Sequence, residues 1–192
     1  MRCVSLLIAF EGLDGAGKST QLRLLADYLT RRGLTPLVVR EPGSTKLGER
    51  IRNLVLTEEM SPATEALLLA AARRELYEEI KSAPLVLSDR WVYSSWVYQG
   101  IARGVGLDFV KQINDVPRAD LLILLDLPLS VSLERMSKSD RIEQAGLDFY
   151  RKVAEGYQSL KSLPETLTFD ATLTTGLLHQ SILDKILPLL ES

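Results

Sequence analysis

The sequence predicts a three-layer α/β/α fold in which helices cover both faces of a central five-stranded parallel sheet. Three observations lead to this prediction. Short apolar segments alternate with helical ones, the apolar segments lack the polar alternation of half-exposed strands, and a glycine-rich turn follows the first strand. The 192 residues, of which 46% are hydrophobic and 25% charged, suffice for the core of one domain spanning residues 1–192.

Five segments are interpreted as strands because they are short, rich in leucine or β-branched residues, and bounded by turn residues. They are Val4–Phe10, Thr35–Val39, Leu85–Ser88, Leu121–Asp126 and Leu167–Asp170. Ligands of such sheets bind at the carboxyl ends of the strands, near the point where the strand order reverses. The residues that follow each strand are therefore the candidates for a functional site.

The segments between the strands carry helix signals. A run from Lys18 to Arg32 has leucines at near-helical spacing and stops at Gly33. Ser61 followed by Pro62 predicts an N-cap and a first helical residue, and the apolar spacing continues to Ile80. A later helix runs through Leu133 and ends at Arg135.

The turn after the first strand matches the pattern G-x-x-x-x-G-K-[ST] from Gly12 to Ser19. Its glycines let successive backbone N–H groups point at phosphate oxygens, and the next helix adds its positive dipole end. Lys18 would reach the β- and γ-phosphates, and the Ser19 hydroxyl would ligate the accompanying Mg²⁺. The predicted nucleoside triphosphate site comprises Gly12, Leu13, Asp14, Gly15, Ala16, Gly17, Lys18, Ser19 and Thr20.

The charge balance indicates small-molecule partners. A formal net charge of -2 gives no electrostatic footprint for duplex nucleic acid or an anionic membrane. No apolar run approaches the roughly 18 residues of a membrane span, and the apolar run Val4–Phe10 is too short for a signal peptide and leads into the phosphate loop. The single cysteine, Cys3, excludes an intramolecular disulfide and fits a cytoplasmic protein.

Charged and aromatic residues follow the second and third strands. Arg40 to Arg52 forms a turn and a short basic amphipathic helix, which in isolation could equally be a solvated loop. After the third strand, Asp89 is placed to hold Mg²⁺ through water, and Arg90 offers a planar fork for a second phosphate. If the next segment is helical, Arg90, Ser94 and Tyr98 share one face, flanked by Ser95 and Gln99. We expect Trp96 to pack onto the sheet.

Two other segments complete the candidate site. Arg73 lies one helical turn after Leu69, whereas Arg74 and Glu78 form an exposed pair. The charged connection at approximately residues 136–146 is interpreted as a lid over transferring phosphate, although a plain surface loop would look similar. The lone histidine, His179, is far from every motif and is interpreted as structural or exposed.

These segments together resemble thymidylate kinases, a family of nucleoside monophosphate kinases with the phosphate-loop kinase fold. The resemblance covers nearly the whole chain, with several motifs in the family's order. The motifs are residues 11–20, 40–43, 47–52, 72–73, 89–90, Ser94 with 98–100, and 140–143. The resemblance implies phosphoryl transfer from ATP, with Mg²⁺, to thymidine monophosphate (dTMP), giving ADP and dTDP, and it suggests a homodimer.

The resemblance also implies roles for individual residues. Asp14 would meet the acceptor's sugar, and Tyr98 would lie against the deoxyribose and discourage a 2′-hydroxyl. The acceptor phosphate would lie among Arg40, Arg52 and Arg90, and the base would be read by Arg73, Ser94 and Gln99. The remaining substrate contacts would be Glu41, Pro42, Leu69, Ser95 and Glu143. The catalytic residues would be Lys18, Asp14, Arg90 and the lid arginines Arg135 and Arg141.

The chain departs from the family pattern at a few positions. Gly15 stands where some members carry an arginine in the phosphate loop, so the arginine would come from the lid, which also holds Lys138. Leu69 replaces a phenylalanine that stacks on thymine, which bears on acceptor preference. Trp91 and Ser44 are further substitutions of usual family residues.

Other functions remain open at this point. A GTP-dependent switch is disfavoured because the sequence has no Asn-Lys-x-Asp element to read guanine. A kinase for a nucleoside or another monophosphate is a second alternative, although the arginines expected around the acceptor favour a charged monophosphate. A third is a phosphate-loop protein that binds ATP without transferring phosphate.

Overall fold

A computed structural model describes residues 6–136 and 146–190 of the chain. Its centre is a five-stranded sheet in which every strand pair is parallel and the order is β2-β3-β1-β4-β5. The strands are β1 (Leu6–Gly12), β2 (Leu37–Arg40), β3 (Leu85–Asp89), β4 (Leu121–Asp126) and β5 (Thr166–Asp170). The predicted fold class is confirmed, and each predicted strand overlaps an observed one.

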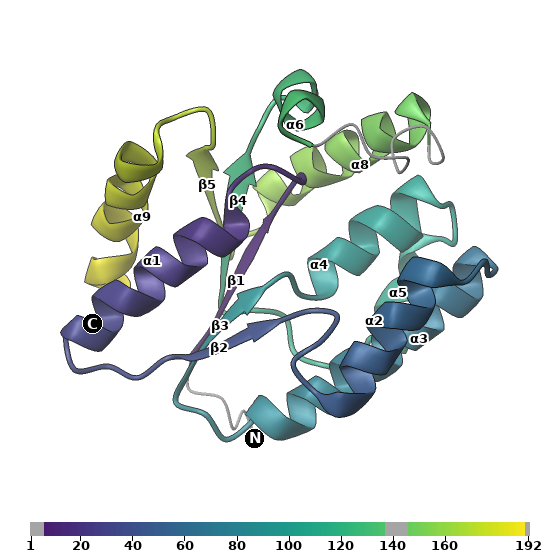
Figure 1. Ribbon diagram of the computed structural model, residues 1–192, viewed down its shortest axis with the longest axis horizontal. Coiled ribbons are helices and arrows are strands. Elements are labelled where there is room, and N and C mark those ends of the chain that lie inside the picture. The colour runs from purple at the N-terminus through teal and green to yellow at the C-terminus, as the bar shows by residue number, and fades with distance from the viewer. Residues whose placement is uncertain (1–5, 137–145, 191–192) are drawn as a thin grey trace.

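One face of the sheet is covered by α1 (Lys18–Arg31) and α9 (Thr175–Leu190), which lie together on that side in Figure 1. Alternate residues of β1 point to opposite faces, as the strand period requires. Ile8 and Phe10 pack with Leu25 and Leu29 of α1 and with Ile182 of α9 in one buried cluster. This apolar contact fixes α1, and therefore the loop that precedes it, against the sheet.

The opposite face is covered by a larger group of helices (Figure 1). They are α3 (Pro62–Ile80), α4 (Val92–Ser95), a π-helix η1 (Trp96–Ala102), α5 (Leu107–Ile113) and α8 (Leu147–Ser159). The β1 residues Leu7 and Ala9 pack into the core beneath them, together with Trp91. Trp96 is also buried there, as expected, in edge contact with Tyr93.

The remaining elements are α2 (Lys46–Thr57), α6 (Leu129–Arg135) and a short 3-10 helix η2 (Leu160–Ser162). Local caps explain two of the helix starts. The Ser61 hydroxyl accepts from the Thr64 N–H before Pro62, as the sequence predicts, and Thr45 accepts from the Gly48 N–H at 2.8 Å before α2. None of the described helices is long and apolar enough to cross a membrane.

The segment after β3 is not the single helix on which a shared face of Arg90, Ser94 and Tyr98 would depend. Arg90 precedes the helix, with φ of 73°, and the short α4 is followed by the π-helix. Arg90 nevertheless lies close to Ser94, because its guanidinium folds back toward the first helical turn.

The strand order places the functional residues together. Because β1 lies between β3 and β4, the order reverses at β1, and the carboxyl ends of β1, β2 and β3 meet at one edge. The register pairs Asp89 of β3 with Phe10 of β1 and with Arg40 of β2. The phosphate loop, Asp89 and Arg40 are therefore neighbours by backbone pairing alone.

Candidate active site

The phosphate loop has the backbone conformation that its glycines predict. Gly15 and Gly17 have φ of 79° and 91°, values that side chains disfavour. A Cβ at Gly17 would meet nothing within 4 Å, so the loop's concave side is open. The Lys18 ammonium donates to the carbonyls of Gly12 and Leu13 at 3.0 and 2.8 Å. The loop is thus closed on itself by the residue expected to reach the phosphates.

Lys18 lies in an unfavourable place for a charge. Burial, and to a lesser degree the nearby Arg90, lower the pKa of Lys18 from 10.5 to about 8, although Asp14 and Asp89 oppose this. A triphosphate beside Lys18 would favour the ammonium form again. The site is therefore electrostatically suited to an anion.

The residues predicted to hold Mg²⁺ lie together at the start of α1. The Ser19 hydroxyl donates to Asp89 Oδ2 at 2.5 Å, so a hydroxyl and a carboxylate oxygen converge below the loop. The described residues contain no cluster of three or more metal-ligating side chains. A hydroxyl and a carboxylate fit Mg²⁺, which keeps several waters and takes other oxygens from the nucleotide.

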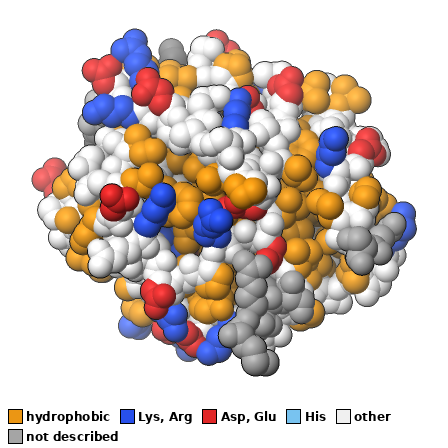
Figure 2. Space-filling model, turned by 180° about the vertical axis from the view of Figure 1, so that it is seen from behind, with side chains coloured by type: hydrophobic (Ala, Val, Ile, Leu, Met, Phe, Trp, Pro, Cys, Tyr) orange, Lys and Arg blue, Asp and Glu red, His pale blue; other side chains and the backbone are white. Residues whose placement is uncertain are grey.

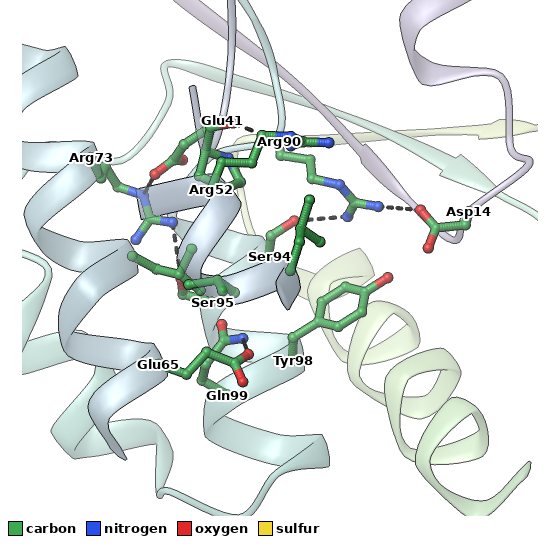
Figure 3. Close-up of a pocket in the computed structure, with 14 residues that line it drawn as sticks. Asp14, Glu41, Arg52, Glu65, Arg73, Arg90, Ser94, Ser95, Tyr98 and Gln99 are labelled. Carbon is green, nitrogen blue, oxygen red and sulfur yellow. Dashed lines mark hydrogen bonds and ion pairs between the residues drawn. The ribbon is translucent and has the colours of Figure 1, made fainter. Parts of the chain in front are cut away.

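Two adjoining cavities open at this edge of the sheet. The first, here called the loop cavity, has a volume of about 420 Å³ and is lined by the phosphate loop, Thr20, Arg40 and Asp89. The second, the helix cavity, has a volume of about 240 Å³ and lies among α2, α3, α4 and η1 (Figure 3). The cavities share four lining residues, which are Asp14, Glu41, Arg52 and Arg90.

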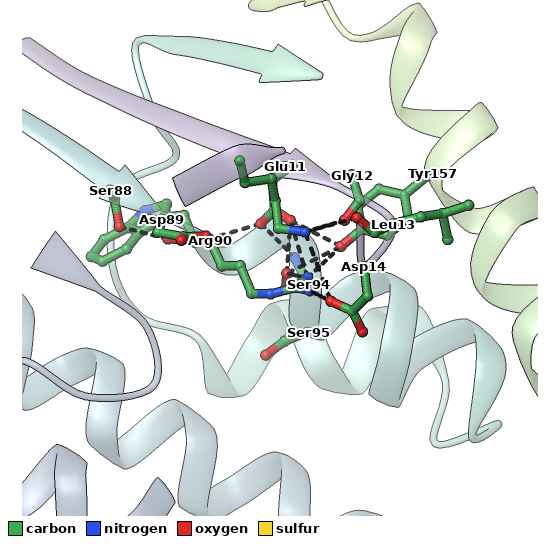
Figure 4. Close-up of polar contacts among 12 residues, drawn as sticks. Glu11, Gly12, Leu13, Asp14, Ser88, Asp89, Arg90, Ser94, Ser95 and Tyr157 are labelled. Atoms are coloured by element: carbon green, nitrogen blue, oxygen red, sulfur yellow. Dashed lines mark hydrogen bonds and ion pairs between the residues drawn. The ribbon is translucent and has the colours of Figure 1, made fainter. Parts of the chain in front are cut away.

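Arg90 lies at the boundary between the two cavities and makes several polar contacts there (Figure 4). Its guanidinium donates to Asp14 Oδ1 at 2.5 Å, to the Tyr157 hydroxyl at 2.8 Å and to the Ser94 hydroxyl at 3.0 Å. Its Cζ also lies 5.4 Å from the centre of the Tyr98 ring. Side chains from the phosphate loop, the helical segment after β3 and α8 therefore fix one guanidinium at the junction of the cavities.

Glu11, at the end of β1, supports the same cluster from below. Its fully buried carboxylate accepts hydrogen bonds from the Trp91 and Ser94 N–H groups and from the hydroxyls of Ser94 and Tyr157. It thus caps the backbone N–H groups at the start of α4. Burial, followed by the Glu11 charge, raises the pKa of Tyr157 well above its usual value, so the phenol keeps its proton.

A second buried cluster surrounds Arg73 on α3. Its Nε lies 2.5 Å from Glu41 Oε1, its NH2 donates to the Ser95 hydroxyl at 2.9 Å, and its NH1 contacts Asn114 Oδ1. Burial raises the pKa of Glu41 above its usual value, although Arg73 opposes this effect. Arg73 therefore presents a guanidinium of fixed orientation to the helix cavity.

The rest of the helix cavity is partly apolar. Leu69 is 8% exposed and forms part of the wall, with Pro42 and Tyr98. Burial raises the pKa of Tyr98 to about 12. Gln99 and Glu65 are further polar residues of the cavity wall. The Gln99 amide NH₂ donates to Glu65 Oε1 at 2.7 Å (Figure 3).

The predicted residues divide between these clusters. Ser94 lies beside Arg90, whereas Ser95 is the serine that contacts Arg73. Arg40 is half-exposed at the rim and pairs with Glu49 at 2.9 Å, and Arg52 donates to the Pro42 carbonyl at 3.2 Å. His179 lines neither cavity and makes an edge contact with Tyr28.

Arg135, at the end of α6, packs directly on the phosphate loop. A Cβ at Gly15 would lie 2.9 Å from the Cβ of Arg135, so Arg135 occupies the space beside the loop. Its NH1 donates to the carbonyls of Gly15 and Ala171 at 3.0 and 3.2 Å. The two other predicted lid residues, Arg141 and Glu143, lie outside the described residues, as do Lys138 and nearly all of the predicted lid at 136–146.

Several residues with evident positions in the site were not predicted from the sequence. Glu11, Glu65, Asn114 and Tyr157 hold the predicted side chains in place. Glu11 carried a signal, since a carboxylate at the end of an apolar strand needs buried partners. Tyr157 is separated from Glu11 by 146 positions in sequence and carried none.

Comparison with known proteins agrees with this geometry. The family model described as thymidylate kinase matches residues 10–182. The chain is 41% identical to a thymidylate kinase of Thermoanaerobacter sp. (strain X514), with 93% of this chain and 96% of the relative covered. The chain belongs to the thymidylate kinase family.

Two further relatives in the thymidylate kinase family differ in identity and coverage. The protein named thymidylate kinase from Fervidobacterium nodosum is 38% identical, with 92% and 96% of the two chains covered. That from Desulforudis audaxviator is 44% identical, with 81% of this chain and 77% of the relative covered. The resemblance inferred from the motifs is therefore confirmed over most of the chain.

Proposed function

We propose that this protein transfers the γ-phosphoryl group of ATP to the phosphate of dTMP, giving ADP and dTDP. Membership in the thymidylate kinase family supports this reaction. The observation that carries it is the pair of adjoining cavities that share Asp14, Glu41, Arg52 and Arg90. A triphosphate in one cavity and a monophosphate in the other would bring the reacting phosphates together at the two shared arginines.

Catalysis in this proposal consists of positioning and charge neutralisation. The transition state spreads negative charge over the transferred group, and cations that are already oriented stabilise it without further reorganisation. Lys18 would contact the β- and γ-phosphates, and Arg90, Arg52 and Arg40 would hold the acceptor phosphate. No general base is needed, because a phosphate monoester is already an anion near neutral pH.

Mg²⁺ would be held by Ser19 and, through water, by Asp89, where these oxygens meet. When bound it would neutralise charge on the β- and γ-phosphates. Arg135, which precedes the predicted lid, contacts the phosphate loop through the Gly15 carbonyl. We propose that it and Arg141 supply the arginine that the loop lacks at Gly15, and that residues 136–146 act as a lid within a single domain.

The base would lie in the helix cavity. Arg73 offers hydrogen-bond donors and Gln99 offers an amide, while Leu69 replaces ring stacking by aliphatic contact. Asp14 would meet the sugar, and Tyr98 would leave little room for a 2′-hydroxyl. A neutral nucleoside would bring no negative charge to the shared arginines, whereas a phosphate monoester would, which favours a monophosphate acceptor.

A product assay tests the proposal. Formation of ADP and of the nucleoside diphosphate is measured with Mg-ATP and the monophosphates of thymidine, deoxyuridine, deoxycytidine, deoxyguanosine and adenosine, with free thymidine as the neutral control. We expect the highest kcat/KM for dTMP and no turnover of thymidine. Preference for another monophosphate would overturn the acceptor assignment, and ATP binding without any turnover would overturn the kinase itself.

We also propose that the protein is a cytoplasmic homodimer, on the basis of the family. Hydrophobic side chains are exposed in several places on the surface, as Figure 2 illustrates for one face. Among them, Leu54 of α2 and Leu67 of α3 are 46% and 50% exposed on two helices that pack together. Light scattering would give about twice the 21.4 kDa chain mass for a dimer. A measured mass equal to that of one chain would overturn the proposal of a homodimer.

A further inference from the structure

Glu65 lies in the first turn of α3 and lines the helix cavity, although it is only 8% exposed. Both of its carboxylate oxygens have donors. Oε1 accepts from Gln99 Nε2 at 2.7 Å, and Oε2 lies 3.1 Å from Arg103 Nε. Arg103 in turn lies over the Phe149 ring of α8, with its Cζ 5.5 Å from the ring centre. The carboxylate is therefore held by two donors from η1 and its C-terminal end, and one of these donors packs on α8.

This contact determines which way the Gln99 amide points. An amide has a donor end and an acceptor end, and a carboxylate can only accept, so the NH₂ must face Glu65. The amide oxygen is left on the other side. Figure 3 shows it directed toward Ser95 and Arg73, within the residues that line the cavity. No described residue donates a hydrogen bond to this oxygen.

We infer that Glu65 is a positioning residue that sets the base selectivity of the helix cavity by orienting Gln99. The inference rests on the proposed function. With its amide held this way, Gln99 presents an acceptor to the base, which suits the ring N3–H of thymine and uracil. Cytosine has a lone pair at N3, so two acceptors would face each other. The same neighbour that fixes Gln99 thus favours bases that carry a ring N–H.

Glu65→Gln tests the inference with the least change in shape. A glutamine at position 65 can either accept from or donate to Gln99, so the Gln99 amide is free to present its NH₂ to the cavity. We expect the ratio of kcat/KM for dTMP over dCMP to fall about tenfold or more. The loss should come mainly through KM for dTMP. The ratio of dTMP to dUMP should stay unchanged, because both bases carry N3–H.

A double-mutant cycle separates positioning from a merely structural effect. In a Gln99→Leu background there is no amide to orient, so Glu65→Gln should no longer change the dTMP to dCMP ratio. Glu75→Gln, which removes the same charge from an exposed position of α3, is the matched control and should leave the ratio at its wild-type value. Glu65→Asp keeps the charge but withdraws the carboxylate by one methylene, and should lower the ratio as well.

Thermal unfolding of each variant shows whether it is folded. If Glu65→Gln does not fold, Glu65→Asp takes its place in the test. An unchanged ratio in a folded Glu65 variant would overturn the inference, as would an equal effect of Glu65→Gln with and without Gln99. Neither result touches the proposed function, provided that the wild type prefers dTMP. A wild type that does not phosphorylate dTMP would instead overturn the proposed function.

Discussion

The loop cavity and the helix cavity are built on different principles. The loop cavity is formed largely by one continuous stretch, residues 12–20, whose backbone conformation follows from its glycines. The helix cavity draws side chains from the phosphate loop, the turn after β2, α2, α3 and the segment after β3. Its polar groups are held by the buried partners Glu11, Asn114 and Tyr157, none of which lines the cavity.

This difference teaches where activity and selectivity are controlled. In the proposed reaction, backbone N–H groups and Lys18 would recognise phosphate, which every nucleotide carries, so changes in the loop cavity should affect all acceptors alike. Oriented side chains would recognise the sugar and base. Changes in the helix cavity, or in the residues that support it, should therefore alter which acceptor is used.

Lys18→Met should have the largest effect. The side chain keeps its length but loses the charge expected at the phosphates, so we expect kcat to fall by about 10²–10³ with every acceptor. Lys152→Met, on the exposed surface of α8, is the control. Single-turnover measurements isolate the chemical step. A rate near that of the wild type, or a loss confined to one acceptor, would contradict the role given to Lys18.

The lowered pKa of Lys18 predicts a pH-dependent stability of the nucleotide-free protein. The unfolded chain binds this proton up to pH 10.5 and the folded one only up to about pH 8. Between these values the unfolded state holds more protons, so folding stability rises with pH. The free energy of unfolding of the wild type should rise by about 3 kcal/mol relative to Lys18→Met over this window. This follows because the pKa of Lys18 differs by about 2.5 units between the unfolded and folded states, and each unit corresponds to about 1.4 kcal/mol.

Denaturant titrations of both proteins between pH 7 and about pH 11 measure this difference. Nucleotide binding supplies an independent check, because phosphates favour the ammonium form. Near pH 8, calorimetry in buffers of different ionisation enthalpy should detect proton uptake on binding of Mg-ATP by the wild type and none by Lys18→Met. A constant stability difference together with no uptake would show that Lys18 has an ordinary pKa.

Arg90→Ala should separate the two cavities. It removes the guanidinium at their boundary, so we expect kcat/KM for dTMP to fall about 100-fold while KM for ATP changes little. Arg74→Ala is the control, since Arg74 lies in an exposed pair with Glu78. Initial rates with each substrate varied in turn check the prediction. Equal losses for ATP and dTMP would mean that Arg90 acts on the phosphate donor as much as on the acceptor.

The same contrast explains what could be predicted from the sequence. The fold class, the strands and the phosphate loop follow from local patterns, because apolar runs and glycine spacing act over a few residues. The turn of the chain at Arg90 and the π-helix after Ser95 could not be predicted from local patterns, because packing and the Glu11 contacts impose them. The sequence predicted that Ser94 and Ser95 line the site, but not that they face different arginines.

Residues that act through others are the hardest to predict. Asn114 and Glu65 reach Arg73 and Gln99 across 41 and 34 positions of sequence, and no periodicity connects such pairs. Their identity depends on which side chains the tertiary fold brings together. By contrast, the exposed Arg74 and Glu78 pair was predictable, because i,i+4 spacing on a helix is a local property.

Leu69→Phe should have the smallest effect and sharpens the view of the helix cavity. An aromatic ring at this wall position could stack on the base, and we expect KM for dTMP to fall about threefold. KM for ATP should not change, because Leu69 does not line the loop cavity. Leu177→Phe, at a 60% exposed position of α9, controls for the added ring. A rise in KM for dTMP would mean that the packed aliphatic wall leaves no space for a ring at this position.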